Sequence, residues 1–334
     1  MTTVHAMAAP DVGKPFEPYE YELPKLGVDQ VEIEVESCGI CHSDLSMQNN
    51  DWEMTQYPFV GGHEVIGRVV ALGNNASHVE VGDRVGLGWF ANSCMHCDQC
   101  VGGDHNLCAS VEGTVTHQFG GFADRVRCHW AWAIPIPDSL PAEKCGPLLC
   151  GGITVFNPML QHRLSPTARV GVVGVGGLGH MALKFLNAWG CDVTAFSRTR
   201  AKEEVAKKYG AHDFVATQED PSLADLAGKF DYIINTTNVD LPWDAYVAAL
   251  APKGVLHTVG AASHVEASWF PMILAQRTLT ASPVGGVIAL RQMIDFCARH
   301  NITAEVETFE MSDVNAAIDR VKEAPPVRVV LTRS

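Results

Sequence analysis

Residues 169–189 read RVGVVGVGGLGHMALKFLNAW, and this stretch predicts the fold of the second half of the chain. The apolar run 169–173 has the pattern of a buried strand, and 178–189 has that of a helix. The turn between them is a G-x-G-x-x-G sequence, whose glycines permit a tight turn and let a pyrophosphate approach the helix N-terminus. A glycine-rich turn that only packs a helix on a sheet is the alternative. The residues of the turn are Gly174, Val175, Gly176, Gly177, Leu178 and Gly179.

Strands and helices continue to alternate after this stretch. A second helical pattern covers 200–209, and strand patterns cover 192–196, 213–216, 231–235, 254–259 and 278–282. This alternation predicts a doubly wound parallel sheet.

The first ~150 residues have a different pattern, with short strands separated by Gly, Asn and Asp turns. Residues 31–36 alternate strictly between apolar and acidic side chains, as a half-buried strand does. The last ~45 residues are mixed and end in a predicted strand at 328–332. The other predicted strands of the N-terminal part are 64–72, 84–89 and 122–127.

The residues after the second strand of the parallel sheet indicate which nucleotide is bound. Enzymes that use NAD usually place an acidic residue there, to bind the hydroxyls of the adenosine ribose. This chain has Ser197, Arg198, Thr199 and Arg200, with Lys202 just beyond. Hydroxyl and cationic groups bind a 2′-phosphate, which a carboxylate would repel. The sequence therefore predicts NADP(H), and a solvated basic helix start is the alternative.

Four cysteines fall within fifteen residues: Cys94, Cys97, Cys100 and Cys108. Four thiolates at these spacings can fill all four positions of a tetrahedral zinc, and such a site is structural. The intervening residues are mostly small or polar, which suits a lobe at about 92–110 that a metal folds. Disulfide-bonded or free cysteines and an iron–sulfur cluster are the alternatives.

A second metal site is predicted from residues that lie far apart in the sequence. Cys41, His63 and Cys150 would give zinc three protein ligands and one open position, which is the pattern of catalytic zinc. Taken singly, each has a structural interpretation, because a lone histidine is usually not a ligand and Cys150 lies in an apolar run.

Composition excludes several classes of protein. The chain has 334 residues and a net charge of −14 without a basic block, which disfavours nucleic-acid binding. No apolar stretch reaches the roughly 18 residues of a membrane span, and the N-terminus lacks the pattern of a signal peptide. The placement of the eleven cysteines fits a reduced, cytoplasmic compartment.

Taken together, these motifs resemble those of the zinc-dependent medium-chain alcohol dehydrogenases, close to the cinnamyl alcohol dehydrogenase branch. The resemblance covers nearly the whole chain and rests on the lobe, GVGGLG (174–179), CGICHSD (38–44), NDWEMTQYPFVGGHE (50–64) and LLCGGITVF (148–156). It implies an α/β protein with a GroES-like catalytic domain (1–152 and 287–334) and a Rossmann domain that binds NADP(H) (153–286). It also implies one catalytic and one structural zinc, and NADPH-linked reduction of aldehydes in which zinc polarises the carbonyl.

The resemblance also implies roles for individual residues. Cys41, His63 and Cys150 match the catalytic zinc ligands, and Glu64 matches a carboxylate that can approach the metal. Asp44 matches the residue that orients the histidine ligand, and Ser43 the hydroxyl that bonds the substrate oxygen and starts the proton relay. Cofactor contacts are expected at His42, Ser43, Thr154, Thr236, Gly260, Pro283, Val284 and Gly285, as well as at the glycine turn, Ser197, Arg198, Thr199 and Lys202.

Some positions depart from the family pattern, and for this reason the resemblance does not predict the identity of the substrate. Ser46 replaces a histidine that ends the relay in many relatives, and serine cannot buffer a proton near neutral pH. Segment 114–119 also departs and borders the expected pocket, while Trp52 and Trp89 fit either that pocket or the core.

Two further readings of the function stay open. One is an NAD-linked polyol or secondary-alcohol dehydrogenase, and the other is a non-catalytic nucleotide-binding protein of the same fold. The resemblance implies a homodimer or homotetramer, paired through the region 269–282.

Overall fold

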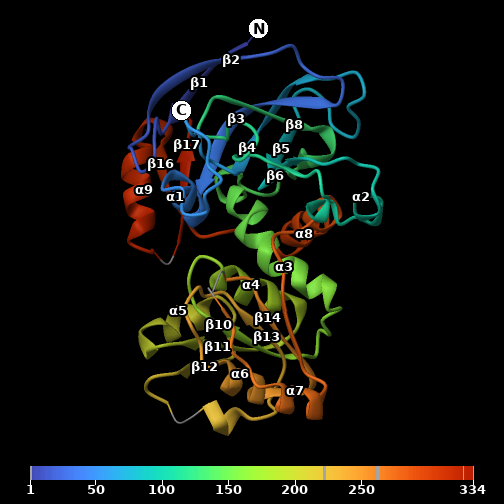
Figure 1. Cartoon of the computed structure of the whole chain (residues 1–334), viewed down its shortest axis with the longest axis vertical. Coiled ribbons are helices and arrows are strands. Elements are labelled where there is room, and N and C mark those ends of the chain that lie inside the picture. Colours follow the sequence, from blue (N-terminus) through green and yellow to red (C-terminus); the bar gives the residue numbers. More distant parts are fainter. Residues whose placement is uncertain (1, 221–222, 261–263, 326, 334) are drawn as a thin grey trace. The chain divides into compact units, whose positions relative to one another are not determined.

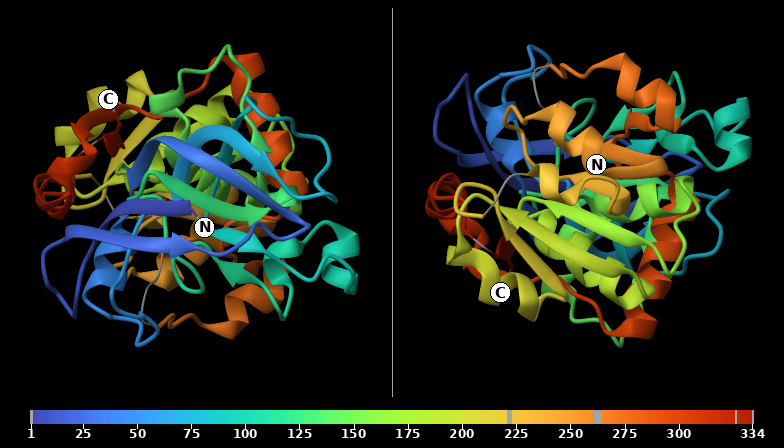
Figure 2. Two further views of the ribbon diagram at one scale, coloured as in Figure 1. Left: turned by 90° about the horizontal axis from the view of Figure 1, so that it is seen from above. Right: turned by 90° about the horizontal axis from the view of Figure 1, so that it is seen from below.

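A computed structural model describes residues 2–220, 223–260, 264–325 and 327–333. The chain divides into two compact units, one formed by Met1–Ile153 with Val284–Ser334 and the other by Thr154–Pro283. In Figures 1 and 2 the first unit is blue to green with red, and the second is green to orange. Within the described residues, no helix is both long enough and apolar enough to cross a membrane.

The first unit is built on a seven-stranded sheet in the order β16-β17-β3-β4-β5-β9, with β8 also paired to β3. β16 and β17 run parallel, and the other pairs are antiparallel. The strands are β3 (Gln30–Ile40), β4 (Glu64–Leu72), β5 (Arg84–Leu87), β8 (Arg125–His129), β9 (Ile134–Pro135), β16 (Val306–Glu310) and β17 (Arg328–Thr332). The last strand of the chain thus lies beside the first strand of this sheet.

Short elements complete the first unit. Its two small hairpins pair β1 (Thr2–Ala8) with β2 (Glu17–Leu23), and β6 (Phe90–Asn92) with β7 (Glu112–Gly113). Its α-helices are α1 (His42–Gln48), α2 (Asp98–Gly102), α8 (Val287–His300) and α9 (Val314–Lys322). Its 3₁₀ helices are η1 (His105–Leu107), η2 (Trp130–Trp132), η3 (Ala142–Lys144), η4 (Gly146–Leu149) and η7 (Met311–Asp313). Helix α3 (Gly151–Gln161) carries the chain into the second unit.

The second unit is a six-stranded, all-parallel sheet in the order β12-β11-β10-β13-β14-β15. The strands are β10 (Arg169–Val173), β11 (Asp192–Ser197), β12 (Asp213–Ala216), β13 (Phe230–Asn235), β14 (Leu250–Thr258) and β15 (Thr278–Ala281). The helices are α4 (Gly179–Trp189), η5 (Arg200–Lys202), α5 (Glu203–Lys208), η6 (Leu223–Leu226), α6 (Trp243–Ala249) and α7 (Trp269–Ala275). This confirms the predicted doubly wound sheet. The strand order reverses between β10 and β13, where such sheets bind ligands.

The predicted strand at 122–127 is shifted in the structure, because β8 begins only at Arg125. The backbone before it is engaged elsewhere: the N–H groups of Gly121 and Phe122 donate to the carbonyls of Gly62 and Gly61. This pairing holds the loop that leads into His63, the first residue before β4.

The strict alternation predicted for 31–36 is also incomplete, because Glu32 is buried. Arg127 on β8 lies opposite Glu32 on β3, and its Nη2 donates to Glu32 Oε2 at 2.6 Å. A second guanidinium, that of Arg125, donates to Glu32 Oε1 at 3.2 Å from a more exposed position. The acid is therefore tolerated inside the sheet because it is paired.

Replacing Arg127 with Met should lower the free energy of unfolding by about 3–5 kcal/mol, since it leaves Glu32 buried beside only Arg125. Arg125→Met is the matched control and should cost roughly 1 kcal/mol or less. Chemical denaturation followed by tryptophan fluorescence measures both. Equal losses for the two variants would show that the Arg127–Glu32 pair contributes no more to stability than the Arg125–Glu32 pair.

Candidate metal centre and nucleotide pocket

The predicted catalytic metal site begins at the N-terminus of α1. Cys41 precedes this helix in extended conformation, and Asp44 in its first turn accepts a hydrogen bond from the backbone N–H of Cys41 at 2.8 Å. Asp44 is fully buried. The bond fixes the conformation at which the strand β3 turns into the helix, and so it fixes where the Cys41 side chain lies.

The same carboxylate reaches the loop before β4. Asp44 Oδ1 accepts from the N–H of Gly62 at 2.9 Å and lies 3.2 Å from His63 Nδ1. Since a carboxylate accepts, Nδ1 of His63 is the donor in this pair, and Nε2 is the ring nitrogen that faces the cysteines. This is the arrangement by which a second carboxylate orients a histidine ligand.

The three predicted ligands meet beyond the histidine ring. His63 Nε2 lies 3.3 Å from Cys150 Sγ, which lies 3.9 Å from Cys41 Sγ. Donor atoms of these residues and of Glu64 all fall within 4.8 Å of one another. Two sulfurs and one imidazole are a donor set that suits zinc.

Glu64 lies at this centre, but its carboxylate is already paired. Arg328, on the last strand β17, donates from Nη2 to Glu64 Oε1, and both side chains are buried. Burial raises the pKa of Glu64 to about 7, although the Arg328 charge opposes that rise. Arg328 is a site residue that sequence reasoning missed. The sequence signal for this role was that a charged residue, Arg328, begins a strand whose next three residues are apolar.

The other predicted catalytic groups lie close by. Ser43 Oγ is 3.7 Å from Cys41 Sγ. The indole of Trp89 lies edge-on to the imidazole of His63, with ring centroids 4.7 Å apart, and it also contacts Trp52. Ser46 is buried, whereas His42 is exposed.

The four-cysteine lobe also brings its thiols together. The Sγ atoms of Cys94, Cys97, Cys100 and Cys108 all lie within 4.8 Å of one another, and none of them forms a disulfide. The backbone N–H of Cys97 donates to Cys94 Sγ. Hydrogen bonds from the N–H groups of His96 and Cys97 lower the pKa of Cys94 to about 6, which favours the thiolate that binds a metal. The lobe therefore fits a closed site of four sulfurs.

The glycine turn of the second unit borders a pocket of about 480 Å³ at the point where the sheet order reverses. Gly174 has φ +95°, and a Cβ on Gly179 would lie 2.0 Å from the Gly174 carbonyl oxygen. Only glycine fits both positions. A Cβ on Gly176, by contrast, would meet nothing within 4 Å, so the turn leaves open space where a phosphate can approach the backbone.

Eight of the predicted cofactor residues line this pocket: Gly174, Gly176, Gly177, Leu178, Ser197, Arg198, Lys202 and Thr236. The Lys202 ammonium donates to the carbonyl of Val175 in the turn. Arg200 does not line the pocket, because its guanidinium pairs with Glu203 and Asp220.

Other predicted cofactor residues lie outside the lining of this pocket. Gly260 has a packing role of its own, since a Cβ there would lie 1.8 Å from the carbonyl oxygen of Thr237. Thr199 is exposed, and Thr154 lies in α3. Pro283 ends the second unit, and Val284 and Gly285 begin the C-terminal part of the first.

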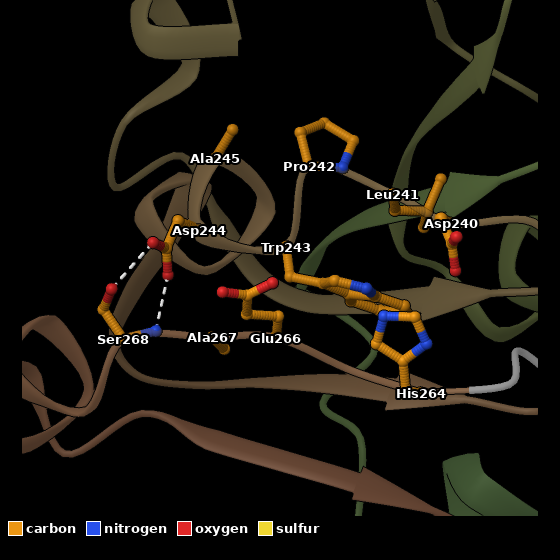
Figure 3. Close-up of a pocket in the computed structure, with 10 residues that line it drawn as sticks. All are labelled: Asp240, Leu241, Pro242, Trp243, Asp244, Ala245, His264, Glu266, Ala267 and Ser268. Carbon is orange, nitrogen blue, oxygen red and sulfur yellow. Dashed lines mark hydrogen bonds between the residues drawn. The ribbon is translucent and has the colours of Figure 1, made fainter.

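A further pocket of about 670 Å³ lies in the second unit, between the start of α6 and the residues before α7 (Figure 3). In this pocket, Asp244 accepts hydrogen bonds from the N–H and the hydroxyl of Ser268 at 2.6 and 2.7 Å, which join the start of α6 to the residue before α7. None of the predicted site residues lines it.

Changing Cys97 to Ala should reduce the zinc content from two atoms per chain to one, because it removes one of the four lobe ligands. We expect the midpoint of thermal unfolding to fall by about 3–4 °C, as a loss of roughly 2–3 kcal/mol gives in a chain of 334 residues. Metal analysis and a thermal melt measure the two effects. Cys191→Ala, at a buried thiol that belongs to neither cluster, is the control and should keep both zinc atoms. Unchanged zinc content in Cys97→Ala would rule out a structural site.

Comparison with known proteins identifies the family. Residues 27–138 match the alcohol dehydrogenase GroES-like domain, and residues 177–299 match the zinc-binding dehydrogenase domain. The aldehyde reductase AdhA of Synechocystis sp. is 46% identical over 99% of both chains.

Two solved structures have the same fold. A cinnamyl alcohol dehydrogenase from Sorghum bicolor is 35% identical, with a TM-score of 0.92 over 99% of this chain and 98% of that one. The cinnamyl alcohol dehydrogenase of Helicobacter pylori, complexed with NADP(H), is 28% identical, with a TM-score of 0.89 over the same shares of the two chains. The chain therefore belongs to the zinc-dependent medium-chain alcohol dehydrogenases, in the branch of the cinnamyl alcohol dehydrogenases.

Proposed function

We propose that this protein is a zinc-dependent, NADP(H)-linked alcohol dehydrogenase that reduces aldehydes to primary alcohols, with aromatic, allylic or aliphatic substrates. The observation that carries the proposal is a set of three donors, Cys41, His63 and Cys150, whose fourth neighbour Glu64 is held by Arg328. A metal bound by three protein ligands keeps one position for a substrate oxygen.

We assign residues 1–152 and 287–334 to the catalytic domain and 153–286 to the cofactor domain. The two compact units support the division, although they place residue 153 and residues 284–286 in the other part, because one unit holds both cysteine clusters and the other holds the nucleotide pocket. When bound, zinc supplies Lewis-acid chemistry at the substrate oxygen, and the nicotinamide supplies hydride.

The protein groups position the reactants and move the proton. Asp44 keeps His63 in the tautomer whose Nε2 is free. Ser43 Oγ, beside Cys41, donates a hydrogen bond to the substrate oxygen and passes a proton to it during reduction. Ser46 is buried and lacks an imidazole, so exposed His42 or water replenishes that proton.

The lining of the nucleotide pocket supports NADP(H). Arg198 is exposed at the rim beside Ser197 and Lys202, and no aspartate or glutamate is among the described residues that form the lining. A 2′-phosphate would therefore meet cations and hydroxyls and no repelling carboxylate. An NAD-linked polyol or secondary-alcohol dehydrogenase is the second candidate, but this rim lacks the acid that it would require.

We also propose that the protein is cytoplasmic and forms a homodimer or a homotetramer. Free thiols and cysteine clusters suit a reducing compartment. Helix α7 supports self-association, since Trp269, Phe270, Ile273 and Leu274 are 67–74% exposed. A cluster of large apolar side chains of this kind is typical of an interface, and the edge strand β15 lies next in the chain.

Initial rates of cinnamaldehyde reduction, with NADPH and with NADH, test the proposed function. We expect a higher kcat/KM with NADPH, and loss of the rate after chelation with recovery on adding zinc. A rate that survives complete removal of zinc would exclude the proposed chemistry. A clear preference for NADH would favour the second candidate, and no turnover in zinc-loaded protein would favour a non-catalytic one.

Changing Arg198 to Asp should lower kcat/KM for NADPH roughly 100-fold and leave that for NADH within about threefold. A charged hydrogen bond is lost, and a repelling charge takes its place. Steady-state kinetics with both cofactors measure the change. Arg200→Gln is the matched control, because Arg200 is paired with Glu203 and Asp220. Equal losses with both cofactors would show that Arg198 does not contact the 2′-phosphate.

A further inference from the structure

The chain passes between the two compact units at two places. The first connection lies inside α3, between residues 153 and 154, and the second follows Pro283. Both connections carry residues that the sequence resemblance implies as cofactor contacts, namely Thr154 on the first and Pro283, Val284 and Gly285 on the second. Whatever holds these two connections in place therefore bears on how the cofactor is bound.

One buried histidine is hydrogen-bonded next to both connections. His257 lies on β14 and is 1% exposed. Its Nδ1 lies 3.0 Å from Nε2 of His162, which directly follows α3. Its Nε2 lies 2.9 Å from Oγ of Ser282, which directly precedes Pro283. Both ring nitrogens of the buried histidine are thus used, one toward each connection.

The register of the parallel sheet explains why these side chains meet. His257 pairs with Ile234 on β13 and with Thr280 on β15. Because alternate residues of a strand share a face, Tyr232 and Ser282 lie on the same face of the sheet as His257. His162 meets them on this face, since its ring centroid lies 5.8 Å from that of Tyr232 and 5.2 Å from that of His257.

The bonds of His257 are those of a neutral ring. Burial lowers the pKa of His257 to about 4, and the neighbouring His162 lowers it as well. Burial also lowers the pKa of His162. An N–H of one ring must face a lone pair of the other, so a single proton lies between the two facing nitrogens. The chain from His162 through His257 to Ser282 is therefore directional, and breaking it would leave a buried polar ring without a partner.

The two connections serve a different part of the cofactor from the nucleotide pocket. The glycine turn and the rim with Ser197 and Arg198 line that pocket, whereas neither Thr154 nor the stretch 283–285 does. The pocket suits the pyrophosphate and the adenosine with its 2′-phosphate. The contacts expected on the connections then remain for the nicotinamide half.

We propose that His257 is a positioning residue for the cofactor, which fixes both connections from the core of the cofactor unit and so holds their contacts in place for the nicotinamide half. This inference rests on the proposed NADP(H)-linked function and adds to it a residue that no motif marks. His257 acts through His162 and Ser282 and touches no reacting atom. Without it, the connections would populate other conformations, and the apparent affinity falls with the competent fraction.

Two probes separate the halves of the cofactor in the full-length, zinc-loaded protein. NADPH carries both halves, whereas 2′,5′-ADP carries the adenosine and its 2′-phosphate without the nicotinamide. Titration calorimetry measures the Kd of each. In His257→Leu we expect the Kd of NADPH to rise about tenfold, as the loss of a buried hydrogen bond gives, and that of 2′,5′-ADP to stay within about twofold.

Tyr232→Phe is the matched control. The Tyr232 ring lies against both histidines, but its buried hydroxyl has no hydrogen-bond partner in the part of the chain that the structure describes. Both Kd values should therefore stay unchanged in this variant. Ser282→Ala breaks only the bond to the second connection, and it should raise the Kd of NADPH about threefold. At this partly exposed position it also tests the chain if His257→Leu does not fold.

Three results would overturn the proposal. An unchanged Kd of NADPH in His257→Leu, or in Ser282→Ala if the first variant does not fold, would show that these bonds do not position the connections. An equal rise with both probes would show that His257 supports the unit as a whole and not the nicotinamide half. If the unmodified protein binds neither probe, the proposed NADP(H)-linked function is itself wrong, and the inference falls with it.

Discussion

The buried carboxylate of Asp44 is the interaction on which the metal centre depends. It bonds the N–H groups of Cys41 and Gly62 and the Nδ1 of His63, and so it joins the start of α1 to the loop before β4. Two ligands far apart in the sequence are thereby fixed by one side chain. The loop is fixed from its other side by Gly121 and Phe122, whose backbone bonds replace the strand expected there. The geometry of the site is therefore set by backbone hydrogen bonds around the ligands as well as by the ligands themselves.

Much of this architecture could be predicted from local sequence. The strands β4, β10, β12 and β17 have the predicted bounds, because each is a short apolar or alternating run between turn residues. Both metal clusters and the nucleotide pocket assemble residues that the motifs singled out. These features depend on residue type and spacing within one segment or one motif.

The features that could not be predicted depend on pairing between distant segments. Glu32 looked like the solvent face of a strand, but Arg127 makes its burial possible. Arg328 looked like the charged end of a strand, yet it binds a residue 264 positions earlier. No local pattern encodes such a pair, since neither Arg127 nor Arg328 differs by its sequence context from an ordinary surface residue. Arg200 shows the converse: its basic neighbourhood fitted phosphate binding, but Glu203 and Asp220 already hold its guanidinium.

The position of β17 beside β3 in the sheet of the first unit has a consequence for synthesis. The three ligands Cys41, His63 and Cys150 leave the ribosome well before residues 328–332, which form the strand that carries Arg328. A nascent chain thus has every donor of the centre, including Glu64, before it has the guanidinium. At that stage the buried carboxylate of Glu64 would lack the cation that pairs with it in the folded protein. The charge balance of this buried site is therefore completed only when the C-terminal strand has been made and inserted beside β3.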